Sequence, residues 1–301
     1  MRDLVKYLDY WFYLPAISLL PPGLAYRMAE LRGDWMCRAR KDSARHAIRN
    51  ILAVFPSLTA RQVSEIARGH YRALSVVEME AFWFTRSAEF FQTHMTVEGL
   101  ENLKSAAGRP GGALVLLPHW GSVATFFVSI GKRGISFYVV GRPIARQQDQ
   151  LHPAHLKAAR KCMADIGDAI GHPLLYTGRG GFSKMRELLQ SGEILMTAFD
   201  VTPHILRNVQ AVQFFGRTAY FPDGLAQLQQ QTGARVFYGF ILRYKQKPYQ
   251  RIEIRRLPEA PAGGEQNLMQ RLVSMLEQEI RKRPCQWTLW DSMEWFYHER
   301  A

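Results

Sequence analysis

The sequence predicts an α/β protein with a mixed, largely parallel sheet flanked by helices. Short apolar runs bounded by Gly, Pro or polar residues are typical of buried strands, and segments with helical spacing lie between them. The predicted strands are 113–117, 135–140, 194–199, 236–242 and 250–256. Alternation of strands with helices favours parallel pairing. With 301 residues, 47% of them hydrophobic, the chain can build a sizeable core in one large or two small domains.

The strand at 113–117 leads directly to the first candidate site residue. Pro118 ends the strand because it has no N–H to donate to a ladder, so His119 lies at a strand's carboxyl end, where open α/β sheets bind ligands. Gly121 and Ser122 open an apolar helical segment, with Ser122 as its N-cap. An imidazole beside free backbone N–H groups suits attack on an acyl carbonyl, because the donors can hold the oxyanion. The alternative is a structural histidine.

Two further strand ends carry polar residues. The strand at 135–140 ends in Gly141-Arg142-Pro143, and Arg142 there suits a phosphate or carboxylate of a substrate, or else a structural ion pair. The strand at 194–199 ends at Asp200. If these strands are neighbours, all three polar side chains meet at one edge of the sheet.

The first 58 residues predict broken helical segments that lie on a membrane surface. Tyr and Trp residues, which favour interfaces, are abundant, and Pro and Gly residues at 15 and 21–23 interrupt the apolar stretch too early for a spanning helix. A basic stretch at 38–49 suits an anionic leaflet. We therefore predict membrane-associating helices over 1–58 and an α/β domain over 59–301. The alternative is that the aromatics are core and the charges a solvated helix face.

The remaining helices follow from capping signals and apolar spacing. Thr59 to Gln62 has the form of a capping box and opens a helix that continues to about Phe84. Glu78 and Glu80 lie among apolar residues, so we expect them to be paired or functional. Further helices are predicted at 182–190, 223–232 and 266–282, and the chain closes with an aromatic segment at 284–297.

The formal charge of +13 favours an anionic partner: nucleic acid, anionic lipid or a phosphate-bearing substrate. No nucleic-acid module accompanies the charge, so we expect no nucleic-acid partner. Cys37, Cys162 and Cys285 are far apart and lack metal-ligand spacing. Such sparse cysteines fit a reducing compartment and argue against a disulfide framework.

The order of these motifs resembles the lipid A biosynthesis (lauroyl/myristoyl) acyltransferases, within the lysophospholipid acyltransferase superfamily. The resemblance covers roughly residues 20–297. It rests on the basic helix followed by 50–58, His119-Trp120-Gly121-Ser122, Arg142-Pro143, the strand ending at Asp200, Phe214-Phe215-Gly216, Thr232-Gly233-Ala234, and Pro284-Cys285-Gln286-Trp287 with Trp290.

The resemblance implies a glycerol-3-phosphate/lysophospholipid acyltransferase-like fold and transfer of a fatty acyl group from an acyl carrier protein or coenzyme A thioester to a lipid-like acceptor. It implies His119 as general base, no metal and no cofactor beyond the acyl donor. It also implies a peripheral location on the cytoplasmic face of the inner membrane. From the residues themselves, we expect the Gly121 and Ser122 N–H groups to bind the oxyanion and Arg142 to bind an anionic substrate group.

One position departs from the family pattern, which has Glu or Asp five residues after the histidine. In this chain that position is Ala124, which cannot accept a hydrogen bond from the imidazole. Another acid could serve His119, with Asp200 preferred over Glu78, Glu80 and Asp291. Alternatively, His119 could act unaided on a more acidic acceptor, as in a divergent thioester-using enzyme of specialised metabolism. The third possibility is a catalytically impaired acyl-binding or scaffolding homologue.

Overall fold

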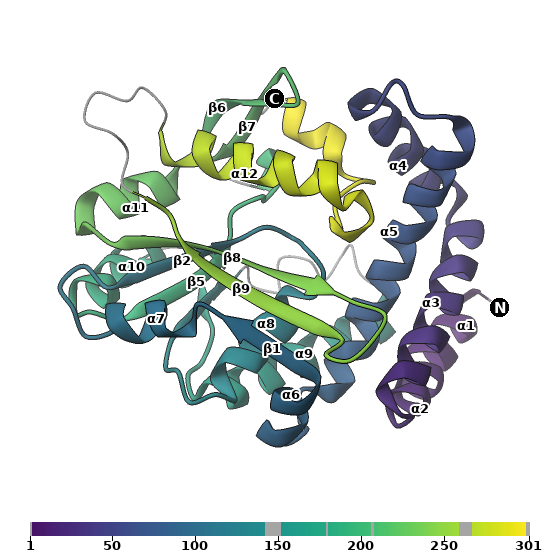
Figure 1. Cartoon of the computed structure of the whole chain (residues 1–301), viewed down its shortest axis with the longest axis horizontal. Coiled ribbons are helices and arrows are strands. Elements are labelled where there is room, and N and C mark those ends of the chain that lie inside the picture. The colour runs from purple at the N-terminus through teal and green to yellow at the C-terminus, as the bar shows by residue number, and fades with distance from the viewer. Residues whose placement is uncertain (1, 142–151, 179, 206–207, 259–266, 299–301) are drawn as a thin grey trace.

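A computed structural model of the chain describes residues 2–141, 152–178, 180–205, 208–258 and 267–298. A seven-stranded sheet in the order β1-β9-β8-β2-β5-β3-β4 forms its centre (Figure 1). The strands are β1 (Met95–Glu98), β2 (Ala113–Leu117), β3 (Tyr138–Gly141), β4 (Leu175–Tyr176), β5 (Ile194–Ala198), β8 (Arg235–Arg243) and β9 (Gln250–Arg256). The five strands from β8 to β4 are parallel, and β9 and β1 run the opposite way. The predicted mixed, largely parallel sheet is confirmed.

β2 lies in the middle of the sheet, and all five of its residues are buried. Its parallel register pairs Leu117 with Ala198 of β5, the last residue of each strand. Two residues beyond each of these ends lie His119 and Asp200. Because paired parallel strands advance together, equal offsets from a shared register bring the two side chains to the same edge of the sheet.

Alternate residues of β2 enter the two core layers, as the two-residue period of a strand requires. Leu114 and Leu116 pack with one layer, which includes Leu228 and Leu276, whereas Val115 packs with the other. The helices of the α/β region are α6 (Ala88–His94), α7 (Leu100–Ala106), α8 (Val123–Gly131), α9 (Pro153–Ile170), α10 (Gly181–Gln190), α11 (Gly224–Thr232) and α12 (Leu268–Lys282). Helices α10, α11 and α12 cover the first face, and α7, α8 and α9 cover the second.

The N-terminal helices form a group beside the sheet, visible as the purple and blue ribbons of Figure 1. They are α1 (Arg2–Leu8), a π-helical turn at Asp9–Tyr13, α2 (Leu14–Ser18), α3 (Pro22–Ala39), α4 (Lys41–Val54) and α5 (Ala60–Glu80). Broken helices in this region agree with the sequence. Within the described residues, no helix is both long and apolar enough to cross a membrane. The division into domains at residue 58 stays a prediction.

The structure differs from the sequence prediction at several elements, among them α5, β3 and a hairpin. The capping box at Thr59 is present, but α5 ends at Glu80 and a 3-10 turn follows it at Ala81–Trp83. The strand expected from 135 begins only at Tyr138. A separate hairpin of β6 (Val209–Phe214) and β7 (Arg217–Pro222) was not predicted, because its stability comes from aromatic contacts with the distant C-terminal segment, among them the 6.0 Å contact of Phe214 with Trp287.

Candidate functional site

His119 and Asp200 form the centre of the candidate site. The imidazole Nδ1 lies 2.7 Å from Asp200 Oδ1. Asp200 is fully buried, whereas 39% of the His119 side-chain surface is exposed. The structure therefore brings together the two residues that the strand ends suggested, with the histidine facing solvent and the acid behind it.

Besides the imidazole, two further donors hold the Asp200 carboxylate. The His119 backbone N–H donates to both of its oxygens, at 2.8 and 2.9 Å, and the Trp287 indole N–H donates to Oδ2 at 3.0 Å. Since a carboxylate only accepts, the proton of the neutral imidazole lies on Nδ1, and the lone pair lies on Nε2. No described residue forms a hydrogen bond with Nε2, so this nitrogen is free to accept a proton.

The carboxylate also controls the basicity of the imidazole. Burial lowers the pKa of His119, but the charge of Asp200 and its hydrogen bonds outweigh that effect and raise the pKa above the usual 6.5. The imidazolium that forms on proton uptake is therefore stabilised by a fixed negative charge.

Within the described part of the chain, neither position 124 nor the other candidate acids form a hydrogen bond or an ion pair with His119. Ala124 is half-buried and packs against the apolar layer on its side of the sheet. Glu78 accepts from the Tyr10 hydroxyl and pairs with Arg32, at 2.6 Å each. Among the described residues, pairing thus explains Glu78, as the sequence suggested.

The two remaining weaker candidates also have other partners. The Glu80 carboxylate accepts from Thr125 Oγ1 at 2.8 Å and from the Gln250 amide. Asp291 accepts from the Ser43 hydroxyl at 2.8 Å. Of the four acids considered from the sequence, Asp200 alone forms a hydrogen bond with His119 in the described part of the chain.

The turn after the histidine corrects one expectation. The Gly121 N–H donates to Gln286 O at 2.9 Å, so it is not available to an oxyanion in this structure. Gly121 has a φ of +55°, which favours glycine at this tight turn. Ser122 is the N-cap of α8, because its Oγ accepts from Thr125 N at 3.2 Å. No described residue accepts a hydrogen bond from Ser122 N–H, which leaves this donor free.

Arg142 lies outside the described residues, so the structure does not place it. A different arginine, Arg243, is the last residue of β8 and lines a small cavity with Gly121 and Ser122. Its guanidinium donates to Glu30 of α3 at 2.7 Å. This ion pair links the carboxyl edge of the sheet to the N-terminal helices.

A closing segment, which we define as residues 284–290, was missed as part of the site. The Thr288 N–H and hydroxyl both donate to His119 O at 2.9 Å, and Trp287 reaches Asp200. The aromatic composition of this segment was the available signal. It did not show where the segment packs, because that contact joins positions about 170 residues apart in the chain.

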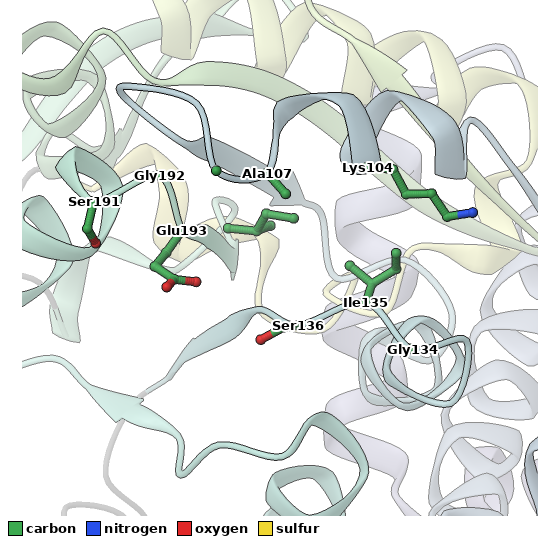
Figure 2. Close-up of a pocket in the computed structure, with 10 residues that line it drawn as sticks. Lys104, Ala107, Gly134, Ile135, Ser136, Ser191, Gly192 and Glu193 are labelled. Atoms are coloured by element: carbon green, nitrogen blue, oxygen red, sulfur yellow. The ribbon is translucent and has the colours of Figure 1, made fainter.

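A larger cavity lies elsewhere, at the amino ends of the strands (Figure 2). Its volume is about 300 Å³, and Figure 2 shows Lys104 and Ile135 on one side and Ser191 and Glu193 on the other. These residues come from the segments that enter β2, β3 and β5. The cavity is thus at the edge opposite His119, and none of the site residues lines it.

The sequence was compared with known proteins. The model of the bacterial lipid A biosynthesis acyltransferase family matches residues 2–292. The chain belongs to this family. No curated protein matches the chain significantly. In this member of the family, the His119–Asp200 pair at the carboxyl edge of the sheet has the geometry for acid–base chemistry.

Proposed function

We propose that the protein transfers a fatty acyl group from an acyl carrier protein or coenzyme A thioester to a hydroxyl or amine of a lipid-like acceptor. The contact between His119 Nδ1 and Asp200 Oδ1 carries this proposal. It orients an exposed imidazole, supplies a buried counter-charge and leaves Nε2 free. The reaction uses the acyl thioester as co-substrate, with no metal and no bound cofactor.

The reaction follows from these groups. His119 Nε2 takes the proton of the acceptor O–H or N–H while the acceptor atom attacks the thioester carbonyl. Asp200 stabilises the resulting imidazolium. The Ser122 backbone N–H is the free main-chain donor closest in sequence to His119 among the described residues and is proposed to hold the oxyanion. The tetrahedral intermediate then expels the thiolate, which receives the proton from the imidazolium, and His119 returns to its neutral form.

A lipid-like acceptor lies in a membrane, and the N-terminal helices offer a surface that suits membrane binding. Large apolar side chains of α1 to α3 are exposed, among them Phe12, Leu19 and Trp35. Exposed basic residues follow on α3 and α4, including Arg38 and Arg45. We propose that this surface binds an anionic leaflet on the cytoplasmic face of the inner membrane. Arg142 remains our candidate for a phosphate or carboxylate of one substrate.

The test incubates the protein with labelled acyl carrier protein and coenzyme A thioesters and with lipid hydroxyl or amine acceptors. General-base catalysis typically contributes 10²–10⁴-fold, so His119→Ala should lower kcat/KM by at least about 100-fold. In the wild type, kcat/KM should rise with pH along a limb whose midpoint lies above 6.5, because the base must be neutral. Asp200→Asn should lower the rate and move this limb to lower pH, since the counter-charge is removed.

Asp291→Asn is the matched control, because it removes a carboxylate that accepts from Ser43 and not from His119. It should leave the rate and the pH limb unchanged. Equal and negligible turnover in wild type and His119→Ala with every thioester would contradict the proposal. That result would favour an acyl-binding or scaffolding homologue.

A further inference from the structure

The closing segment pairs with the turn that carries His119. Gly121 N donates to Gln286 O, and Thr288 N donates to His119 O, both at 2.9 Å, on either side of an antiparallel bridge between Trp120 and Trp287. Two strand-like hydrogen bonds thus fix the segment in register with the catalytic turn. The side chain of Trp287 is placed by this pairing.

The Trp287 indole is fully buried and held on several sides. It contacts Trp290, Phe214 and Phe296, with ring centroids 5.1, 6.0 and 6.3 Å away. The backbone carbonyl of Trp287 accepts a hydrogen bond from His70 Nδ1 at 3.3 Å. A ring enclosed in this way cannot turn its N–H away from Asp200 without repacking the cluster.

Three tryptophan indoles are buried beside the site, and their N–H groups differ in their hydrogen-bond partners. The Trp290 N–H donates to Pro284 O at 2.6 Å, and the Trp120 N–H has no acceptor among the described residues. The Trp287 N–H donates to Asp200 Oδ2 at 3.0 Å. Aromatic packing alone therefore does not explain the orientation of Trp287, which is directed at the acid.

We infer that Trp287 is a positioning residue that holds the Asp200 carboxylate with Oδ1 facing His119. This inference rests on the proposed function. The indole takes Oδ2 and the imidazole takes Oδ1, so the carboxylate cannot rotate to present the other oxygen without losing a bond. A neutral donor also leaves the carboxylate its full negative charge. An arginine in this place would neutralise the charge that stabilises the imidazolium.

The first test is Trp287→Phe, which keeps an aromatic ring but removes the N–H. A less well oriented base should lower kcat about 10-fold or more, with KM changed little, because Trp287 is fully buried and does not face the substrates. Without the indole N–H, the carboxylate has one hydrogen-bond donor fewer and therefore interacts more strongly with the imidazolium. The acid limb of kcat/KM should therefore move upward by about half a pH unit.

Trp290→Phe is the control, because it removes an equally buried N–H from the same segment. It should leave both kcat and the acid limb unchanged while lowering the melting temperature by a comparable amount. An unchanged kcat and pH limb in Trp287→Phe would overturn the inference. So would equal losses in both variants, since these would show a packing role only.

A second measurement needs neither a variant of Trp287 nor turnover. In the wild type labelled with ¹⁵N, the Trp287 indole N–H resonance should shift with pH with the same midpoint as the His119 ring, and in His119→Ala this shift should disappear. If the chemical shift of the Trp287 indole does not change as His119 titrates, the inference is wrong. If wild type transfers no acyl group but the resonance follows His119, the proposed function fails while the positioning of Asp200 stands.

Discussion

In the proposed function, Asp200, which follows another strand, serves His119 in place of an acid at position 124. The resemblance implies an acid five residues after the histidine, which in this chain is Ala124, on the helix that follows β2. In this chain the carboxylate comes from the end of β5, whose register with β2 places it 2.7 Å from His119 Nδ1. With that nitrogen already bonded, position 124 can pack against the apolar layer instead. The third possibility raised by Ala124, an impaired homologue, stays open to the turnover test.

Glu80 is a second buried acid near the site, and it differs from Asp200 in its surroundings. It is fully buried, accepts from Thr125 and Gln250, and has no Lys or Arg within ion-pair distance among the described residues. Burial raises its pKa to about 7, against the hydrogen bonds that favour its charged form. The acid is therefore partly protonated near neutral pH.

This raised pKa predicts a pH dependence of stability. A pKa higher in the folded than in the unfolded state stabilises the fold at low pH, and the contribution is lost as pH rises from about 4.5 through about 7. The loss amounts to at most about 3 kcal/mol. Glu80→Gln should remove this part of the slope, so its melting temperature should fall less than that of wild type between about pH 5 and about pH 8.

Thermal unfolding at several pH values checks this expectation. The raised pKa of His119 contributes a slope of the same sign, so both proteins should be compared in a His119→Ala background. If the two melting curves run parallel across this pH range, Glu80 does not titrate as described.

At the scale of elements, the crossing of α3 and α5 depends on one glycine. A Cβ on Gly33 would lie 2.5 Å from Arg72 Cα, closer than atoms approach in folded proteins. The same contact brings Asp34 to Arg68 and Arg72, which both bind it through paired hydrogen bonds. These ion pairs hold the pKa of Asp34 well below its usual range.

Gly33→Ala should therefore destabilise the protein although alanine favours helices by about 1 kcal/mol. The forced separation of α3 and α5 should cost about 1–3 kcal/mol and lower the melting temperature. Gly167→Ala in α9 is the control, because its Cβ would meet only ordinary contacts, the nearest at 3.4 Å. It should keep or raise the melting temperature, and an equal fall in both variants would contradict the close-packing argument.

At the scale of the whole molecule, exposed apolar side chains gather on the N-terminal helices. Phe12 and Leu19 have 67% and 78% of their surfaces exposed, and Leu31 and Trp35 of α3 are also exposed. Figure 1 shows these helices together beside the sheet. Residue types that are buried elsewhere in the chain are exposed on these helices. This is the arrangement expected of a membrane-binding surface.

Vesicle binding tests this surface directly. The double variant Phe12→Ser/Leu19→Ser should bind vesicles containing anionic lipid at least about tenfold more weakly, because two apolar side chains no longer leave water. Added salt should weaken wild-type binding through the basic residues of α3 and α4. Trp295→Ser is the control, as Trp295 is exposed but lies in the C-terminal region. Binding that Trp295→Ser weakens as much as the double variant does would contradict this placement.

The sequence by itself determined those strands and helices that carry local signals. The strands β8 and β9, the capping box of α5 and the N-cap of α8 follow from residues within a few positions of one another, since apolar period and capping act over single turns. Placing His119 and Asp200 at one edge was also possible, because parallel strands end on the same side. The family resemblance was equally available from motif order, and the family match confirms it.

Only the tertiary structure decided which groups remain free at that edge. The Gly121 N–H is occupied by Gln286, and the Trp287 N–H reaches Asp200, because the closing segment pairs with the His119 turn. The β6–β7 hairpin likewise depends on aromatic contacts with the C-terminal region. These contacts join positions from about 70 to 170 residues apart. Local propensity carries no information on such pairings. They are fixed only when the strand order of the sheet and the packing of the core are established.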